Sequence, residues 1–270
     1  KDLYAPLLPH KAVRGVLKQE LADLYHIPRL KAISVPSHDT AAAVLSVPTE
    51  DEHVAFISSG TWSLIGTELS DPLINETVQR LGFSNEGGAL DTITLLKNSC
   101  GMHILQNIKR ELEFKENRKY AWDEIVELSR PGLSLPTLPT FDVNHESLYN
   151  PASMIRAVSE LTGIEEIGDI IASSYRSLAL SYGDTIKDLE DITGKHYDTI
   201  HIIGGGARND HVNQMTADLT HKRVVSGPEE ATSLGIIAMQ ILRDFHHYTT
   251  ADLRAIIRDS VPLGVFTPKA

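Results

Sequence analysis

The chain has 270 residues, of which 41% are hydrophobic and 23% charged, which is ordinary for a globular protein with a sizeable core. Its 36 acidic residues outnumber 25 basic ones, and the net charge of −11 argues against nucleic acid or an anionic membrane as a partner. The single cysteine, Cys100, excludes an internal disulfide and indicates a reducing compartment, so we expect a cytoplasmic location. No apolar run approaches the ~18 residues that would span a bilayer.

The first element predicted along the chain is a helix over residues 10–25. Its apolar residues recur at helical spacing on one face: Val13, Val16, Leu17, Leu21 and Leu24. Pro28 ends this helix, and residues 32–35 form a short predicted strand that Pro36 stops. The small, apolar stretch 37–46 then predicts a buried helix.

The middle of the chain predicts paired strands followed by helices. Residues 53–57 and 62–69 form two strands joined by a turn at 58–61, and residues 83–86 and 92–95 form further strands around Gly87 and Gly88. Helices are predicted over 98–112 and 120–129, followed by a surface connection that contains Pro131, Pro136 and Pro139. Another helix is predicted to begin at 150–151, with proline in its first turn.

The last third alternates helices and strands. The longest predicted helix covers 167–189, and a strand over 198–203 leads through three glycines into a helix over 209–219. A strand at 223–225, a turn at 227–228 and a helix over 229–245 follow. Because strands pair early and alternate with helices later, the sequence predicts the α/β class, with a mixed sheet flanked by helices.

The first segment that could carry chemistry is 37–40, between a predicted strand and a predicted helix. Asp39 lies where the free N–H groups and positive potential of a helix start converge. A carboxylate placed there can act as a general base that accepts a proton from an alcohol. The alternative is that Asp39 or Ser37 only caps the helix.

The second segment is the predicted hairpin turn 58–61. Serine, glycine and threonine at such a turn can direct N–H groups and hydroxyls at a phosphate, and Gly60 lets a ligand approach the backbone. An ordinary hairpin with nothing bound remains the alternative. The segment is not a Walker loop, because no Gly-Lys-Ser/Thr follows it.

The third segment is the glycine triplet Gly204, Gly205 and Gly206, between a buried strand and a helix. Three glycines cost conformational entropy unless the backbone needs unusual dihedrals or closeness to a ligand. A nucleotide lying across them at the helix start is the functional interpretation, and a tight strand-to-helix turn is the alternative. The spacing does not match a dinucleotide fingerprint.

Other conspicuous residues carry structural interpretations. The twelve histidines form no metal-ligand spacing, so we predict no metal site made by this chain. Cys100 is expected to be a small core residue, and Trp62 and Trp122 are expected to be packing residues.

Taken in order, these segments resemble the C-terminal half of the FGGY carbohydrate kinases, which have two actin-like (ribonuclease H-like) ATPase domains with ATP and sugar between them. The blocks that carry the resemblance are PSHDTAAAV (36–44), SSGTWSL (58–64), NEGGA (85–89), LKN (96–98), NP (150–151), GGGARN (204–209) and GPEEATSLG (227–235). They are more similar to those of rhamnulokinases than to those of glycerol or xylulose kinases, and they extend over nearly the whole chain.

The resemblance implies a role for each matched residue. It makes Asp39 the catalytic base and places His38, Thr40 and Asn98 against the sugar. It also implies that Gly60, Thr61 and Gln106 bind ATP, with Gly204, Gly205 and Gly206 at the adenosine. Since Gln106 lies eight residues beyond Asn98, we expect both on one face of a single helix. The cofactors implied are ATP and Mg²⁺, and the acceptor implied is L-rhamnulose, phosphorylated on oxygen 1.

The resemblance covers only one half of such a kinase. Residues 1–36 resemble the tail of the N-terminal half, and residues 37–270 resemble the C-terminal domain. The start of the chain, which has no Met, fits a beginning in mid-protein. The partners expected are therefore the sugar, ATP and the N-terminal half, without which we expect little phosphorylation. The alternatives are a kinase for another ketose (fuculose or xylulose), a non-catalytic nucleotide-binding module, or a structural domain that binds nothing.

Overall fold

The computed structural model describes residues 7–51, 53–133 and 137–269. Within these residues the centre of the fold is a seven-stranded mixed sheet with the order β5-β6-β4-β3-β7-β8-β9. Its bounds are β3 (Ala55–Ser59), β4 (Trp62–Leu69), β5 (Ser84–Gly87), β6 (Ile93–Cys100), β7 (Thr199–Ile203), β8 (Arg223–Ser226) and β9 (Gly264–Phe266). β3, β7 and β8 run parallel, and the outer strands pair antiparallel. The predicted α/β class with a mixed sheet is confirmed.

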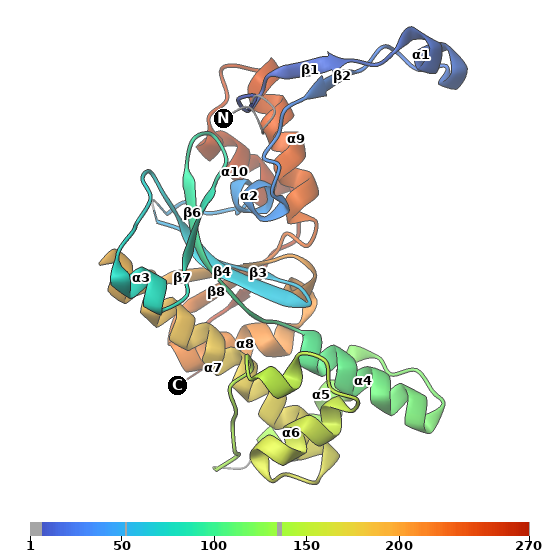
Figure 1. Ribbon diagram of the computed structural model, residues 1–270, viewed down its shortest axis with the longest axis vertical. Helices are drawn as coiled ribbons and strands as arrows, with labels where there is room; N and C mark the ends of the chain where they lie inside the picture. Colours follow the sequence, from blue (N-terminus) through green and yellow to red (C-terminus); the bar gives the residue numbers. More distant parts are fainter. Residues whose placement is uncertain (1–6, 52, 134–136, 270) are drawn as a thin grey trace.

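Helices cover both faces of this sheet (Figure 1). One face carries α2 (Asp39–Leu45), α9 (Ala231–Asp244) and α10 (Thr250–Ser260). The other carries α7 (Ile167–Thr193) and α8 (Asp210–Thr220). Because strand residues alternate between faces, Phe56 packs into the core under α2 while its neighbour Ile57 packs into the core over α7.

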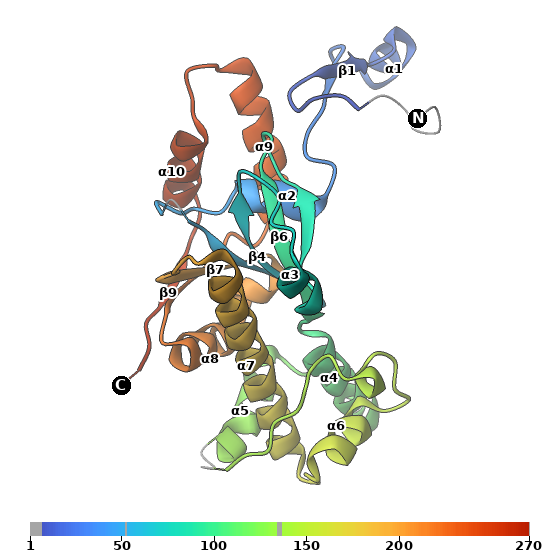
Figure 2. The same ribbon diagram turned by 60° about the vertical axis from the view of Figure 1, so that its left-hand side comes forward.

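A second group of helices extends beyond the sheet. It consists of α4 (His103–Glu116), α5 (Trp122–Leu133) and α6 (Met154–Thr162), and all three contact α7. α7 is long enough to reach from the sheet into this group (Figure 2). Gly132 and Gly168 let α5 and α7 approach closely, because a Cβ on either would lie within 2.5 Å of the other helix. None of the described helices is both long and apolar enough to cross a bilayer.

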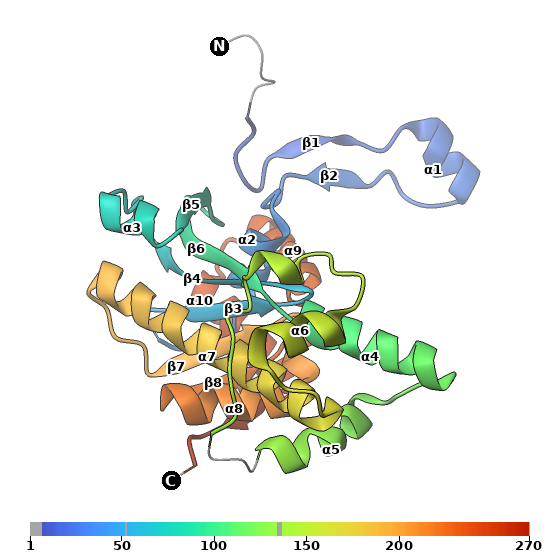
Figure 3. The same cartoon turned by 60° about the horizontal axis from the view of Figure 1, so that its bottom comes forward.

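The N-terminal residues form a ribbon that stands away from the sheet in all three views (Figures 1–3). It contains β1 (Val13–Val16), α1 (Gln19–Tyr25) and β2 (Lys31–Ile33). The predicted helix over 10–25 is therefore wrong in its first half, since Val13 pairs with Ile33 in an antiparallel ladder. All four residues of β1 are exposed, so no core selects the helical face that their spacing suggests.

Three further boundaries differ from the sequence prediction. The helix expected from residue 98 begins at His103, because β6 continues to Cys100 along its ladder with β4. Pro131 lies inside α5 and not in the connection, and Pro136 lies outside the described residues. α6 begins at Met154, since Ser153 and not Pro151 precedes it as the capping residue. The short helix α3 (Glu76–Arg80), the single turn η1 (Glu146–Leu148), α10 and β9 have no counterpart in the prediction.

Candidate active site

The candidate site is built at the edge where the parallel strands β3 and β7 end. The turn that connects β3 to β4 follows Ser59, and the glycine triplet follows Ile203 in the neighbouring strand. Open α/β sheets bind their ligands outside the carboxyl ends of parallel strands. The register therefore brings together two of the three segments singled out in the sequence.

The glycine triplet packs directly on Ser59. Gly204 has φ +83°, a conformation that side chains rarely adopt, and a Cβ on it would lie 3.0 Å from the Ser59 carbonyl oxygen. A Cβ on Gly206 would lie 2.0 Å from Ser59 Oγ. These two glycines are thus explained by the tight turn η2 (Gly205–Arg208) and its packing on β3.

Ser59 is held from below by a buried tyrosine. Tyr182 of α7 hydrogen-bonds through its hydroxyl to Ser63 Oγ at 2.7 Å and to Ser59 Oγ at 3.2 Å. Burial raises the pKa of Tyr182, so the hydroxyl keeps its proton. This link fixes both strands of the hairpin relative to α7.

A pocket of about 420 Å³ lies between the hairpin turn, η2, α4 and α5. Its lining residues are Gly60, Thr61, Met102, Gln106, Trp122, Gly205, Gly206, Arg208 and Asn209. Five of the six residues predicted to bind ATP therefore share one pocket, and the sixth, Gly204, lies directly behind it at the start of the turn.

The first residues of α4 clasp the hairpin turn. The N–H of Met102 donates to the Gly60 carbonyl at 2.9 Å, and the N–H of His103 donates to the Thr61 carbonyl at 3.1 Å. The Thr61 hydroxyl donates to Gln106 Oε1 at 3.3 Å. These bonds join the turn to the first two turns of α4, so Thr61 and Gln106 are positioned as a unit.

The turn offers fewer N–H groups than its sequence suggests. The Gly60 N–H already donates to the Trp62 carbonyl at 2.9 Å, so the polar groups that Thr61 and Gln106 present are mainly side chains.

Gly205 contributes its exposed backbone to the pocket. It is exposed, and a Cβ added to it would meet no atom within 4 Å, so the packing of the chain itself gives no reason for glycine at this position. Closeness to a ligand gives one.

Four pocket residues were absent from the predicted site: Met102, Trp122, Arg208 and Asn209. Trp122 was expected to pack internally, but it is 37% exposed and forms part of the pocket wall. Arg208 forms an ion pair with Glu229, and Asn209 caps α8 by accepting from the Val212 N–H at 3.0 Å. Arg208 and Asn209 follow the glycine triplet after a single alanine, which was a usable signal, whereas nothing in the local sequence marks Trp122. Trp62 is also not internal, being 46% exposed beside His103.

Asp39 presents an exposed carboxylate at the start of α2. Its side chain is 78% exposed, and Oδ1 accepts from the Thr40 N–H at 2.7 Å. His38 approaches Oδ1 at 3.7 Å through Nε2 and Glu86 at 3.4 Å through Nδ1. The residue that caps α2 is His38, which makes no side-chain cap bond, so the alternative that Asp39 or Ser37 serves as a helix cap is not supported.

The placement of α2 puts Asp39 at the same edge of the sheet as the glycine triplet. The Asp39 carbonyl accepts from Thr232 Oγ1 at 3.3 Å in the first turn of α9. Just before this helix, Glu229 pairs with Arg208 on the wall of the pocket, and the Pro228 carbonyl accepts from the Gly204 N–H at 3.1 Å. Asp39 itself does not line the pocket. It is connected to the pocket wall through the start of α9 and the residues just before that helix.

The predicted sugar contacts are less unified. Asn98 lies on β6 opposite Leu64 and is exposed, so the expectation that Asn98 and Gln106 share one helix is wrong. Thr40 is only 4% exposed, and its hydroxyl lies 3.4 Å from Asp39 Oδ1. Its contact with a sugar stays a prediction, and its observed contacts instead orient the Asp39 carboxylate.

Among the described residues, no group of three or more His, Cys, Asp or Glu side chains could hold a metal ion. Cys100 is buried, as expected, and burial raises the pKa of its thiol to about 11, so it is not a nucleophile at neutral pH.

The layered mixed sheet, with a glycine-lined pocket at the carboxyl edge of its parallel strands, defines the chain as an α/β domain of the actin-like ATPase class. Solved structures agree on the fold. The xylulose kinase from Rhodospirillum rubrum superimposes with a TM-score of 0.70 at 15% identity, over 98% of this chain and 52% of that one. The Plasmodium falciparum glycerol kinase with ADP gives a TM-score of 0.64 at 15% identity, over 97% and 51%.

Sequence comparison gives the family. The pattern described as "FGGY family of carbohydrate kinases, C-terminal domain" matches residues 55–243, so this chain belongs to the FGGY family of carbohydrate kinases. Rhamnulokinase of Bacillus subtilis (strain 168) is 36% identical over 98% of this chain and 55% of that protein. Rhamnulokinase of Klebsiella pneumoniae (strain 342) is 34% identical over 89% and 49%. The chain spans about half the length of the curated relatives it matches.

Proposed function

We propose that the chain is the nucleotide-binding half of an ATP-dependent ketose kinase that converts L-rhamnulose to L-rhamnulose 1-phosphate. The observation that carries this proposal is that Thr61, Gln106, Gly205 and Gly206 face one pocket at the carboxyl edge of β3 and β7. Membership of the FGGY family and similarity to rhamnulokinases supply the reaction and the sugar. The single, buried cysteine suits an enzyme of the reducing cytoplasm.

In this proposal the pocket holds ATP, with the Thr61 hydroxyl near its phosphates and its adenosine part along Gly205 and Gly206. Gln106 binds a further part of the nucleotide while it keeps Thr61 in place. Mg²⁺ would neutralise phosphate charge in such a reaction, usually bound by one or two carboxylates and the phosphates themselves. The described residues do not form a metal cluster, so no residue of this chain is assigned to it.

Asp39 is the proposed base. Its carboxylate accepts the proton of the sugar hydroxyl as that oxygen bonds to the γ-phosphorus, while the bond from this phosphorus to the bridging oxygen breaks and ADP leaves. The Thr40 N–H holds Oδ1, and Oδ2 has no hydrogen-bond partner in the described part of the chain. We assign His38 and Asn98 to the sugar, and Thr40 to the orientation of Asp39.

The exposure of Asp39 separates this proposal from a nucleotide switch without transfer chemistry. A switch domain has no need of a solvent-accessible carboxylate oriented by its neighbours, whereas a phosphoryl transfer to an alcohol does. A kinase for fuculose or xylulose would use the same residues. The similarity to rhamnulokinases favours L-rhamnulose among these ketoses.

The proposal also requires the other half of the kinase. Many exposed apolar side chains lie in or next to the N-terminal ribbon, namely Leu7, Leu8, Val13, Val16, Leu21, Leu24, Tyr25, Ile27 and Leu30. An accumulation of exposed apolar side chains of this kind is typical of an interaction site. We assign it to the N-terminal half, since the relatives are about twice as long as the matched region. Alone, the chain should bind ADP weakly and transfer little phosphate.

The test uses the chain joined to the N-terminal half of the kinase, in a coupled assay that measures ADP release. L-rhamnulose should give the highest kcat/KM, against L-fuculose and D-xylulose. Asp39→Asn should lower kcat by about 10²–10⁴-fold and leave ADP affinity unchanged, because general-base catalysis contributes that much. Asp71→Asn, an exposed carboxylate in the turn after β4, is the matched control. Unchanged turnover in Asp39→Asn would remove Asp39 as the base, and a preference for another ketose would change the assigned sugar.

A further inference from the structure

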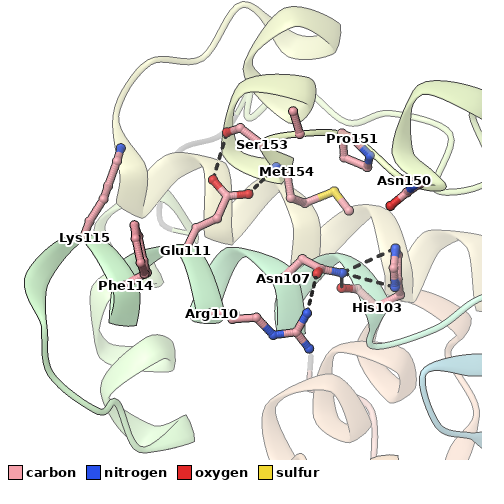
Figure 4. Close-up of a pocket in the computed structure, with 11 residues that line it drawn as sticks. His103, Asn107, Arg110, Glu111, Phe114, Lys115, Asn150, Pro151, Ser153 and Met154 are labelled. Carbon is pink, nitrogen blue, oxygen red and sulfur yellow. Dashed lines mark hydrogen bonds between the residues drawn. The ribbon is translucent and has the colours of Figure 1, made fainter.

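A second and larger pocket lies on a different face of α4. It has a volume of about 550 Å³ and is formed between α4 and the segment that leads into α6 (Figure 4). From α4 it is lined by His103, Asn107, Arg110, Glu111, Phe114 and Lys115. Apart from the last, these are spaced for a single face of a helix. Its size is typical of small-molecule sites, and its lining combines the polar and charged side chains of α4 with the apolar Phe114, Pro151, Ala152 and Met154.

The polar groups of this pocket are held in fixed positions. Asn107 Nδ2 donates to the His103 carbonyl at 2.8 Å, and Asn107 Oδ1 accepts from Arg110 Nη1 at 3.1 Å (Figure 4). Glu111 accepts from Ser153 Oγ at 2.8 Å and from the Met154 N–H. The only carboxylate of the pocket is therefore occupied by the first residues of α6 and does not face a ligand alone.

The positive charges of the pocket are not satisfied in this way. Within the described residues neither Arg110 nor Lys115 is part of an ion pair, and Arg110 uses only one of its donors. Together with the engaged Glu111, they leave the pocket net positive in a chain whose net charge is −11. A guanidinium with free donors matches the oxygens of a carboxylate or phosphate.

The apolar walls indicate what the anion must be attached to. Phe114 is 88% exposed at one end of the pocket, and Pro151 and Met154 form the wall opposite α4. An exposed aromatic ring beside a fixed guanidinium offers a stacking surface next to a charge. A bare inorganic anion would leave this apolar surface in water, whereas a flat apolar group would cover it.

His103 connects the second pocket to the hairpin turn that borders the first. Its ring stacks on Trp62, with ring centroids 6.0 Å apart and an angle of 9° between the ring planes, and His103 lines the second pocket. Its backbone N–H donates to the Thr61 carbonyl at 3.1 Å. A ligand that moves the backbone of His103 would therefore also move the Thr61 carbonyl and the turn that carries it.

We propose that this pocket is a second small-molecule site, which takes an organic anion that joins a carboxylate or phosphate to a flat apolar body. We further propose that its occupancy is transmitted to the hairpin turn through His103. The binding stands on the pocket alone, whereas the transmission to nucleotide rests on the function proposed above.

Isothermal titration calorimetry of the chain with 1-naphthyl phosphate and with 1-naphthoate tests the site and separates the two kinds of anion. Inorganic phosphate and 1-naphthol, which each lack one half of the recognised chemistry, should bind at least tenfold more weakly. Arg110→Gln should weaken binding of the better anion about tenfold or more, and Phe114→Ser several-fold. Both side chains are exposed, so the fold should be retained. Arg156→Gln is the control, because it makes the same charge change in an exposed ion pair on α6.

Absence of saturable binding, or equal binding by all three variants, would overturn the site. Displacement of the naphthyl compound by ADP in simple competition would place it in the nucleotide pocket and would also overturn it. Binding of both together, with ADP affinity changed by the same factor that ADP imposes on the naphthyl compound, is the expected result. Independent binding of the two ligands would remove the transmission through His103. Failure of the chain to bind ADP would count against the proposed function and not against the anion site.

Discussion

The three adjacent glycines after β7 have different physical reasons. Gly204 needs a positive φ, and Gly206 needs the absence of a Cβ because Ser59 lies against it. Gly205 needs neither, yet it is the exposed member that lines the pocket with Thr61 and Gln106. The triplet therefore combines two structural requirements with one position for which the packing of the described residues gives no reason.

This difference predicts opposite outcomes for two alanine substitutions. Gly206→Ala should lower the free energy of unfolding by about 1–3 kcal/mol, the usual cost of overpacking a buried contact. Gly205→Ala should change it by less than about 0.5 kcal/mol but weaken ADP binding, because its new methyl group projects into open space at the pocket. Urea denaturation and ADP titration of both variants measure the two effects. Unchanged ADP affinity in a stable Gly205→Ala would contradict the assigned role.

At the residue scale, the pocket residues that lie in short motifs could be identified from the sequence. Thr61 and Gly205 follow strands whose ends are predictable, and the resemblance to the FGGY kinases implied that both would lie against one ligand. Trp122 could not be identified as a pocket residue from the sequence. Its exposure depends on how α5 packs against α7, which lies far along the chain, and no local sequence pattern encodes such contacts. Asn98 was predicted at the start of a helix over 98–112, whereas the ladder of β6 with β4 decides its conformation.

At the scale of elements, the hairpin and α7 form one mechanical unit. Tyr182 is the link, since its hydroxyl bonds Ser59 and Ser63 on the two strands that flank the turn. Tyr182→Phe should lower the free energy of unfolding by about 1–3 kcal/mol, because it leaves buried serine hydroxyls with a lost partner. Chemical denaturation measures this, with the half-exposed Tyr149→Phe as control. Equal stability of the two variants would show that the hydroxyl does not fix the hairpin.

β7 carries a buried histidine that makes the fold sensitive to acid. Neither ring nitrogen of His201 has a hydrogen-bond partner in the described chain. Burial, followed by the nearby Arg254 and Arg223, lowers the pKa of His201 to about 4. Since the unfolded chain binds this proton more readily, the stability is complete above pH ~6.5 and is lost as the pH falls toward 4.

The contribution of His201 to this pH dependence should be about 3 kcal/mol, from a shift of roughly 2.5 pH units at 1.36 kcal/mol each. His201→Leu should therefore show a smaller fall in unfolding free energy between pH 6.5 and pH 4 than the parent chain. Denaturation curves at several pH values measure the slope, with the exposed His246→Leu as control. Parallel curves for the parent and His201→Leu would show that this histidine does not titrate as inferred.

Elements were predictable where both periodicity and packing agree. The strand predicted over 62–69 is β4 with the same bounds, and the apolar face of the helix predicted over 167–189 is buried in α7. The helix predicted over 10–25 was wrong in its first half for the opposite reason. The residues of β1 are exposed and contact no core, so their helical spacing does not determine their structure. β9 and α10 were missed since short or polar-flanked segments acquire their structure from the sheet edge and from α9 that they cover.

For the whole molecule, substitutions in the exposed ribbon should distinguish the stability of the chain from its association with a partner. Leu24 is 65% exposed, so Leu24→Ser should leave the unfolding free energy of the chain within about 0.5 kcal/mol of the parent value. If the N-terminal half of the kinase covers the ribbon, the same substitution should weaken association of the two halves by about 1–2 kcal/mol, the value of burying the remaining side-chain surface. Ile74→Ser is the control, because Ile74 is 82% exposed and comes just before α3, which lies away from the ribbon (Figure 1), so it should do neither.

Hydrogen exchange locates this interface independently of affinity. Amides of residues 13–33 should exchange quickly in the chain alone, because the ribbon pairs only with itself and buries a single alanine, Ala22, among the residues of its strands and helix. They should become protected when the N-terminal half is added. Sedimentation of the chain alone decides whether a second copy covers the ribbon instead. A concentration-dependent dimer that Leu24→Ser dissociates would assign the ribbon to self-association. Protection that arises elsewhere would show that the N-terminal half does not bind the ribbon.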